Sequence, residues 1–196
     1  MLLVALTGNY GMGKSALLNM FGKLGAHTID SDEVVGSLLK EQKVLDKIRD
    51  ILGAEVFDPE GGLDRKKVAD AIFKDSALRA SLENLLHPLV FDGIDAVIAQ
   101  REGEDAIMVV EIPLLFERGY EKKFNRTITV FTDEATALAR LEKKGIGRPE
   151  ALQRLRAQIP ILDKIGKSDF VIDNNGSPED AMSGVKRIYE RLLKEV

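Results

Sequence analysis

The feature that most restricts the fold is a glycine-rich stretch at residues 8–15, GNYGMGKS. It matches G-x-x-x-x-G-K-[ST], the pattern of the phosphate-binding P-loop. The apolar run over residues 2–7 before it is typical of a buried parallel strand, and apolar residues at helical spacing follow over residues 16–24. A glycine loop between a strand and a helix is the context that this motif requires, so we interpret residues 8–15 as a P-loop.

The residue types of this loop explain how it would hold a nucleotide. Glycines let the backbone turn tightly and bring its N–H groups against phosphate oxygens. We expect the following helix to begin at Gly13 or Lys14 and to add its positive end to the same anion. The Lys14 ammonium is expected to reach the β- and γ-phosphates, and the Ser15 hydroxyl to ligate Mg²⁺. The expected ATP-binding residues of this segment are Gly8, Gly11, Met12, Gly13, Lys14, Ser15 and Ala16.

A second nucleotide-binding pattern overlaps the first. Residues 11–16 also match G-x-G-x-x-[GA], the dinucleotide fingerprint, and Asp30 and Asp32 follow at about the 20-residue distance of a ribose-binding acid. In this alternative the first glycine comes late after Thr7, and the adjoining lysine and serine have no role. We therefore prefer the P-loop and keep the dinucleotide site as the alternative.

Four more segments have the pattern of short buried strands. They are residues 25–29, 106–112, 126–131 and 169–173. Between the first two, most of residues 34–102 have apolar side chains recurring at helical spacing, and no strand pattern is present. The sequence therefore predicts an α/β chain with a three-layer P-loop fold, in which a five-stranded parallel sheet carries a helical insertion that is a natural place to hold a second substrate.

The helical insertion contains recognisable start and stop signals. Gly53 is expected to end one helix, Asp64 to cap the next, and Pro88 to occupy the first position of a further one. Arg65 and His87 are the polar residues here that a second substrate could use. On sequence alone, a structural or solvated role is the commoner one for both.

Acidic residues lie at or just after the carboxyl ends of two of the predicted strands. Because the carboxyl ends of parallel strands form the ligand-binding edge of a sheet, Asp32 is a candidate general base beside the transferred phosphate. An N-cap role for Ser31 or Asp32 is the alternative. Glu111 is a candidate to hold Mg²⁺ through water or to contact a substrate, and alternatively it pairs with a nearby cation.

Residues 138–168 form a basic segment, with eight Lys or Arg and three Asp or Glu in a chain of net charge −4. A basic, helical, glycine-interrupted segment between two strands fits a lid that closes on polyphosphate. For most of its cations a solvated helix face is the simpler explanation. Arg140 is the exception we prefer, because it is expected to face the end of the fourth strand.

Several short pieces of this sequence occur together and in this order in one known family. They are residues 6–8 with 13–15, then Ile29-Asp30-Ser31-Asp32, Leu85-Leu86-His87-Pro88, residues 113–117, Arg140-Leu141, residues 154–158 and residues 171–176. The P-loop is shared by many families, but I-D-x-D, H-P and P-L-L-F-E in this order are much more specific. On these pieces, which run the length of the chain, it resembles the dephospho-CoA kinases, which complete coenzyme A synthesis.

The resemblance implies that ATP, with Mg²⁺, phosphorylates the ribose 3′-hydroxyl of dephospho-coenzyme A. Asp32 aligns with the acid proposed as base or orienter, and Arg140 with a lid arginine that contacts phosphates. The turn at residues 174–176 matches a loop near the adenine, which adds Asn175 and Gly176 to the expected ATP-binding residues. The expected substrate-binding residues are Asp32, Arg65, His87 and Glu111.

The chain departs from the family pattern at a few positions. Asn9 stands where a second glycine is usual, Met12 where a small residue is common, and Ala16 where threonine is usual. In the lid, Lys144 occupies the position of a usual second arginine. A lysine lacks the bidentate fork of arginine, and Arg148 is the alternative replacement.

The resemblance also divides the chain. We expect a single kinase domain with a core at residues 1–30, 105–137 and 169–196. Residues 31–104 would bind the coenzyme and residues 138–168 would form the lid. Another small-molecule or nucleotide P-loop kinase is the nearest alternative. A regulatory GTPase is disfavoured because the chain lacks N-K-x-D.

Composition excludes several other classes of function. A net charge of −4 gives no global positive field for nucleic acid. The absence of cysteine excludes disulfides and thiolate chemistry, and two histidines are too few for a multi-histidine metal site. No apolar run approaches the roughly 18 residues of a membrane span, and the chain enters a strand without a leader. We therefore expect a cytoplasmic protein with no nucleic-acid or membrane partner. The partners that the resemblance implies are ATP and dephospho-coenzyme A.

Overall fold

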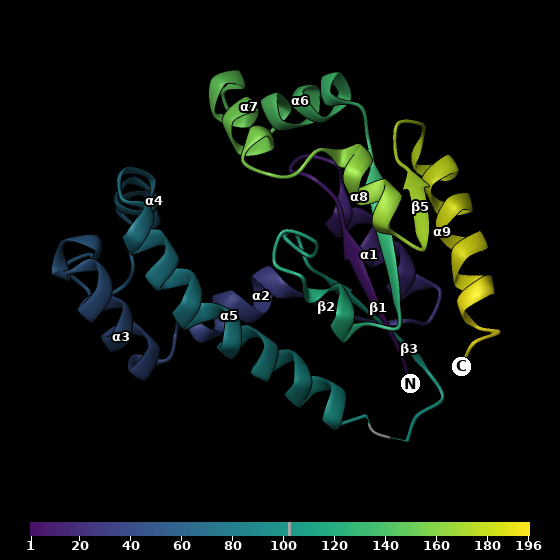
Figure 1. Cartoon of the computed structure of the whole chain (residues 1–196), viewed down its shortest axis with the longest axis horizontal. Coiled ribbons are helices and arrows are strands. Elements are labelled where there is room, and N and C mark those ends of the chain that lie inside the picture. The colour runs from purple at the N-terminus through teal and green to yellow at the C-terminus, as the bar shows by residue number, and fades with distance from the viewer. Residues whose placement is uncertain (102) are drawn as a thin grey trace. The chain divides into compact units, whose positions relative to one another are not determined.

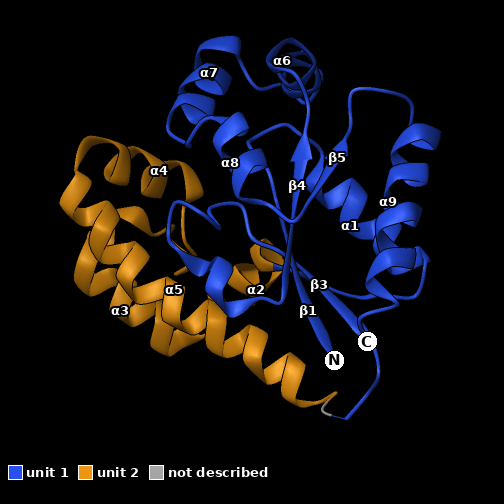
Figure 2. Cartoon of the chain, turned by 45° about the vertical axis from the view of Figure 1, so that its right-hand side comes forward, with its two compact units in different colours: residues 1–30, 102–196 blue, residues 31–101 orange. Residues whose placement is uncertain are grey.

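The computed structural model describes residues 1–101 and 103–196, which form two compact units (Figure 2). The first unit comprises residues 1–30 with 102–196 and contains the sheet and the P-loop. The second unit comprises residues 31–101 and is helical. Among the described residues, no helix combines the length and the hydrophobicity that crossing a bilayer would need.

The first unit is built on a parallel sheet of five strands in the described part of the chain (Figure 1). The strands are β1 (Leu2–Thr7), β2 (His27–Asp30), β3 (Ile107–Glu111), β4 (Arg126–Phe131) and β5 (Phe170–Asp173). Their order across the sheet is β2-β3-β1-β4-β5. The predicted five-stranded parallel sheet is therefore confirmed. Its second strand begins at His27, because Gly25 has a φ of +105° and belongs to the turn that precedes it.

This strand order rules out the dinucleotide-binding alternative. In that fold the second strand lies directly beside the first. Here β1 pairs with β3 on one side and with β4 on the other, and β2 pairs with β3. The connection from β1 to β2 therefore passes over the position that β3 occupies between them. The carboxyl end of β1, where the P-loop begins, lies in the middle of the sheet edge.

Helices cover both faces of the sheet. Side chains alternate along β4, so Ile128 and Val130 join the apolar core with α1 and α9, which pack against each other. On the other face, Thr129 Oγ1 donates to the carbonyl oxygen of Lys164 in α8 at 3.5 Å. The helices of this unit are α1 (Lys14–Lys23), η2 (Tyr120–Lys123), α6 (Glu134–Lys143), α7 (Arg148–Arg156), α8 (Ile161–Lys167) and α9 (Pro178–Leu192).

The second unit has an apolar core of its own. The core residues are Val44, Ile48, Leu52, Val56, Phe57 and Leu82. As predicted, Asp64 caps a helix, because its Oδ1 accepts from the N–H groups of Lys66 at 3.0 Å and Lys67 at 3.1 Å. The helices are α2 (Ser31–Leu38), α3 (Gln42–Leu52), η1 (Ala54–Val56), α4 (Arg65–Lys74) and α5 (Ser76–Ala99).

The expectation that Pro88 occupies the first position of a new helix is wrong. Pro88 lies in the interior of α5, which continues from Ser76 to Ala99. A proline there has no N–H for the bond to the carbonyl four residues earlier, that of Asn84. Buried residues lie on both sides of it, at Leu82 and Val90. Packing of this long apolar helix therefore outweighs the local preference of proline.

The last helix of the chain, α9, begins with a capping box formed by Ser177 and Asp180. The Asp180 N–H donates to Ser177 Oγ at 3.2 Å, and the Ser177 N–H donates to Asp180 Oδ2 at 3.0 Å. The Ser177 hydroxyl also donates to Asp180 Oδ2, at 2.8 Å. The side-chain bond and then the backbone bond from Ser177 hold the pKa of Asp180 below its usual 3.8.

Ser177→Ala is expected to lower the melting temperature at neutral pH by roughly 2–4 °C, the shift of one lost helix cap in a chain of this size. Because the folded state lowers the pKa of Asp180, the part of this stabilisation that depends on its charge is present above pH 3.8. It is lost as the pH falls through the lower, folded-state pKa. The difference between wild type and variant should therefore shrink below pH 3.8. Thermal melts followed by circular dichroism measure this, and equal melting temperatures at neutral pH would contradict it.

Candidate active site

The P-loop joins β1 to α1 and has a shape that depends on glycine. Gly11 and Gly13 have φ angles of +80° and +87°, in the left-handed region. A Cβ on Gly11 would lie 2.8 Å from Leu141 Cδ1 of α6, and a Cβ on Gly13 would collide with the side-chain amide of Asn174. Helix α1 begins at Lys14, as predicted, so the N–H groups of its first turn point toward the loop. The loop and the helix end together form a site suited to an anion.

Lys14 and Glu111 meet beneath this loop. Glu111 ends β3 and lies opposite Leu6 of β1 and Asp30 of β2 in the strand register. The Lys14 Nζ atom is 3.9 Å from Glu111 Oε1 and 3.5 Å from the carbonyl oxygen of Asn9. Both charged side chains are buried. The structure thus places Glu111 beside the lysine that is expected to contact the β- and γ-phosphates.

Arg140 extends from α6 to the ends of β4 and β5. Its Nη2 donates to the carbonyl oxygen of Asn174 at 2.7 Å, and its Nη1 donates to Thr132 Oγ1 at 3.4 Å. The Nη1 atom is also 3.6 Å from the position that a Cβ on Gly13 would occupy. The guanidinium group therefore borders the phosphate-binding loop.

The turn after β5 is also tied to the P-loop. Asn174 Nδ2 donates to the Met12 carbonyl oxygen at 2.8 Å, and Thr132 Oγ1 donates to the same oxygen at 3.3 Å. Asn175 and Gly176, the expected adenine-side residues, follow in the same turn. Within this turn it is thus the side chain of Asn174, to which the sequence assigned no role, that is hydrogen-bonded to the P-loop.

The cations of the lid segment differ in their surroundings. Lys144 is the exposed C-cap of α6, and Arg148 Nη1 lies 3.3 Å from Glu142 Oε1 with 61% of its side chain exposed. Arg154 of α7 instead contacts the P-loop. Its Nη1 donates to the Tyr10 hydroxyl at 2.9 Å, and its guanidinium carbon lies 4.9 Å from the centre of the Tyr10 ring. Sequence analysis considered Lys144 and Arg148 as the second lid cation, but the structure brings Arg154 to the loop.

Three of the expected substrate-binding residues belong to the second unit. Asp32 is exposed in the first turn of α2, two residues after the end of β2. Since α2 begins at Ser31, Asp32 lies inside the helix and is not its N-cap. Arg65 is the exposed first residue of α4, and His87 is half-buried in the middle of α5.

Two residues near the P-loop lie in segments that the sequence singled out, residues 113–117 and the basic segment 138–168, but the sequence assigned neither of them a role. Glu117, in the segment after β3, and Lys164 of α8 form an ion pair of 2.8 Å in which Lys164 is fully buried. Burial lowers the pKa of the Lys164 ammonium from its usual 10.5, and the hydrogen bond and charge of Glu117 oppose that shift. The local signal was weak: a lysine between Leu162 and Ile165 in a short helix.

The site offers oxygen donors, which suit hard cations such as Mg²⁺. Among the described residues, no cluster of three or more His, Cys, Asp or Glu side chains could hold a metal by itself. Ser15 is exposed in the first turn of α1, and the buried Glu111 carboxylate lies beside Lys14. A hydroxyl and a carboxylate suit Mg²⁺, which keeps most of its ligands as water and nucleotide phosphates.

Arg140→Lys is expected to lower kcat roughly 10-fold, because lysine keeps the charge but loses the planar fork that now joins Thr132 and Asn174. Arg156→Lys, at an exposed position of α7, is the matched control and should leave kcat unchanged. Steady-state kinetics with ATP in excess would measure both. An equal effect of the two changes would remove Arg140 from the site.

Known proteins resemble this chain over nearly its whole length. A family model described as dephospho-CoA kinase matches residues 2–180. A dephospho-CoA kinase of Aquifex aeolicus is 34% identical over 98% of this chain and 98% of its own. Among solved structures, protein TT1252 of Thermus thermophilus has a TM-score of 0.85 and 28% identity, covering 100% of this chain and 97% of the other. A dephospho-CoA kinase of Campylobacter jejuni has a TM-score of 0.73 and 26% identity over 98% of both chains.

Proposed function

Because this chain belongs to the dephospho-CoA kinase family, we propose that it phosphorylates the ribose 3′-hydroxyl of dephospho-coenzyme A with ATP, giving coenzyme A and ADP. The family match over residues 2–180 carries this proposal, since P-loop kinase geometry alone suits many acceptors. In the reaction, the 3′-oxygen bonds to the γ-phosphorus and the bond from that phosphorus to the β,γ-bridging oxygen breaks. The hydroxyl proton leaves to a base or to water.

On the nucleotide side, we assign phosphate binding to the P-loop and its neighbours. The backbone N–H groups around Gly11 and Gly13 and the start of α1 would hold the phosphates, with Lys14 on the β- and γ-groups. Arg140 would stabilise the charge that develops between these groups, since its guanidinium already borders the loop. Asn175 and Gly176 would line the adenine. Positioning and electrostatics of this kind supply most of the rate in phosphoryl transfer.

On the acceptor side, we assign to Asp32 the hydrogen bond from the 3′-hydroxyl, which would orient it for attack and take up its proton. The resemblance of residues 29–32 supports this role, as does the place of Asp32 just after a parallel strand. Glu111, Arg65 and His87 would contact the coenzyme. Glu111 has the most restrictive surroundings of the three, because it is buried beside Lys14.

Magnesium and the cellular setting complete the proposal. Mg²⁺ bound with ATP would neutralise phosphate charge, and we assign the Ser15 hydroxyl as its protein ligand. We propose a cytoplasmic location, where ATP is supplied. The proposed partners are the two substrates alone, without nucleic acid or membrane.

The acceptor is tested by measuring ADP release with ATP, Mg²⁺ and a panel of acceptors. Dephospho-coenzyme A should support turnover, and the same molecule without its 3′-hydroxyl should not. Nucleosides, nucleoside monophosphates and other small alcohols represent the alternative of another P-loop kinase. Turnover with one of these, and none with dephospho-coenzyme A, would replace the proposed function by that alternative.

A further inference from the structure

A buried ion pair lies next to the phosphate-binding loop but has no part in the mechanism above. Lys164 is 0% exposed, and its Nζ atom is 2.8 Å from Glu117 Oε1. The same Nζ donates to the carbonyl oxygen of Pro113 at 3.0 Å. Pro113 follows β3, and its carbonyl also accepts from the hydroxyl of Thr7, the last residue of β1, at 3.3 Å. The pair thus fixes α8 to the segment after β3 at the point where the P-loop begins.

Stability alone is a poor reason for such a pair. Removing two charges from water has a large cost, and well-packed apolar residues of similar size are often as stable or more so. Burial lowers the pKa of Lys164, and the hydrogen bond and charge of Glu117 oppose that shift. The Glu117–Lys164 pair is therefore better explained by the segments that it holds in position than by its contribution to the free energy of unfolding.

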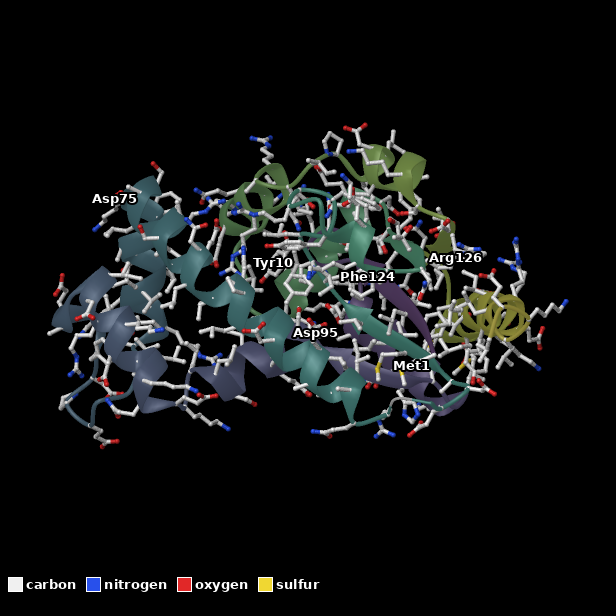
Figure 3. All side chains as sticks on the ribbon, turned by 60° about the horizontal axis from the view of Figure 1, so that its bottom comes forward. Met1, Tyr10, Asp75, Asp95, Phe124 and Arg126 are labelled. Atoms are coloured by element: carbon white, nitrogen blue, oxygen red, sulfur yellow. The ribbon has the colours of Figure 1, made fainter. Side chains whose placement is uncertain are left out.

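Glu117 also reaches the connection between α7 and α8. Its Oε1 accepts from the Ile159 N–H at 3.3 Å. The Ile159 carbonyl in turn accepts from Asn9 Nδ2 at 3.1 Å, and the neighbouring Gln158 Oε1 accepts from the Tyr10 N–H at 2.7 Å. Residues 158–159 are therefore hydrogen-bonded to Glu117 of the ion pair and also to Asn9 and Tyr10 of the P-loop. Tyr10 is labelled in Figure 3.

Asn9 connects this arrangement to the catalytic lysine. Its side chain is held by Ile159, and its carbonyl oxygen accepts from Lys14 Nζ at 3.5 Å and from the Met12 N–H at 3.3 Å. Asn9 is 5% exposed. A glycine at this position would provide the carbonyl but not the bond to Ile159. The position of Asn9 O therefore depends on a side chain that is held from outside the loop.

We propose that Glu117 and Lys164 are positioning residues, which act through Ile159 and Asn9 to hold the P-loop and its Lys14. The ion pair fixes the α7–α8 connection, and the connection fixes Asn9. A loop held in this way before ATP arrives needs less reorganisation when the phosphates bind. The inference rests on the proposed function for its kinetic readout, but its contacts stand independently of the acceptor.

Asn9→Ala is the most direct test. It removes the side-chain hydrogen bond to the Ile159 carbonyl and leaves the backbone hydrogen bonds of the loop in place. Within the described residues Asn9 Oδ1 has no hydrogen-bond partner, so the change removes no second bond. We expect kcat to fall roughly 10-fold and the Kd for ATP to rise by a similar factor, the equivalent of one hydrogen bond. The KM for dephospho-coenzyme A should change less than about twofold, because that substrate has no contact with Asn9 in the proposed roles.

Glu117→Gln and a double-mutant cycle test the path. Glu117→Gln should also lower kcat. The Asn9→Ala/Glu117→Gln double variant should resemble the more severe single variant, because both changes interrupt the same chain of contacts from Glu117 through Ile159 to Asn9. Arg126→Gln is the control. It breaks the Arg126–Glu195 ion pair of 2.9 Å near the other end of β4, and Figure 3 shows Arg126 well apart from Tyr10. It should leave kcat and the ATP Kd unchanged.

Three results would overturn the proposal. They are a lowered melting temperature with unchanged kcat, kcat losses that multiply in the double variant, and an unchanged ATP Kd in Asn9→Ala. If Glu117→Gln does not fold, an unchanged kcat and ATP Kd in Asn9→Ala still overturn the proposal, because the pair is proposed to act through Asn9. If the wild type does not phosphorylate dephospho-coenzyme A, the proposed function fails. The ATP Kd of Asn9→Ala then still tests the positioning role. A roughly 10-fold increase in this Kd is expected, and an unchanged Kd would overturn the positioning role.

Discussion

Lys14→Ala is expected to lower kcat/KM for ATP by roughly 1,000-fold, at the upper end of what one lost electrostatic donor costs. The Lys14 ammonium is buried beside Glu111, at the start of α1 and below the glycine loop. Placed there, a positive charge acts in surroundings that screen it less than water does. Both tight ATP binding and the rate of transfer should therefore fall.

Lys23→Ala is the matched control for this change. Lys23 lies in the last turn of the same helix and is exposed, so its loss should leave the kinetics unchanged. ATP binding by calorimetry and turnover by ADP release should be measured on both variants, with thermal melts to confirm that each is folded. Wild-type kinetics in a folded Lys14→Ala variant would refute the P-loop assignment.

Asp32→Asn is expected to lower kcat by ~100-fold or more while the Kd for ATP stays within about twofold. Asparagine has nearly the shape of aspartate but cannot take up the proton of the 3′-hydroxyl. In the proposed roles Asp32 contacts the acceptor hydroxyl and is not an ATP ligand, so the Kd for ATP should not depend on its charge.

Glu33→Gln tests whether the effect is specific to Asp32. Glu33 is the next residue, exposed in the same first turn of α2, so this variant removes the same charge from the same helix end. It should keep near-native turnover. Comparable losses in the two variants would indicate a general field effect on the helix end, and near-native turnover in Asp32→Asn would remove Asp32 from the chemistry.

Local patterns in the sequence predicted the elements of this fold well. The strands at residues 2–7 and 126–131 are continuous apolar or β-branched runs, and the P-loop follows one of them directly. Each of these signals is complete within a dozen residues. Pro88 shows the limit of local rules, because the packing of a 24-residue helix outweighs one unfavourable residue.

The surroundings of the P-loop could not be predicted in the same way. Arg154 and Tyr10 are 144 residues apart in the chain, and Asn174 and Met12 are 162 apart. No local spacing encodes such contacts, since they depend on the order of the strands. The same holds for Glu117 and Lys164, whose residue types are ordinary in their own segments.

The identity of the product is the most direct test of the proposed phosphorylation of dephospho-coenzyme A. Wild-type protein would be incubated with ATP, Mg²⁺ and dephospho-coenzyme A, and the coenzyme analysed by mass spectrometry and by ³¹P–¹H correlation. We predict a coenzyme with one added phosphoryl group, whose phosphorus couples to the ribose C3′ proton. The amount of this product should equal the amount of ADP formed. ATP binding without a phosphorylated coenzyme, or phosphate at another position, would contradict it.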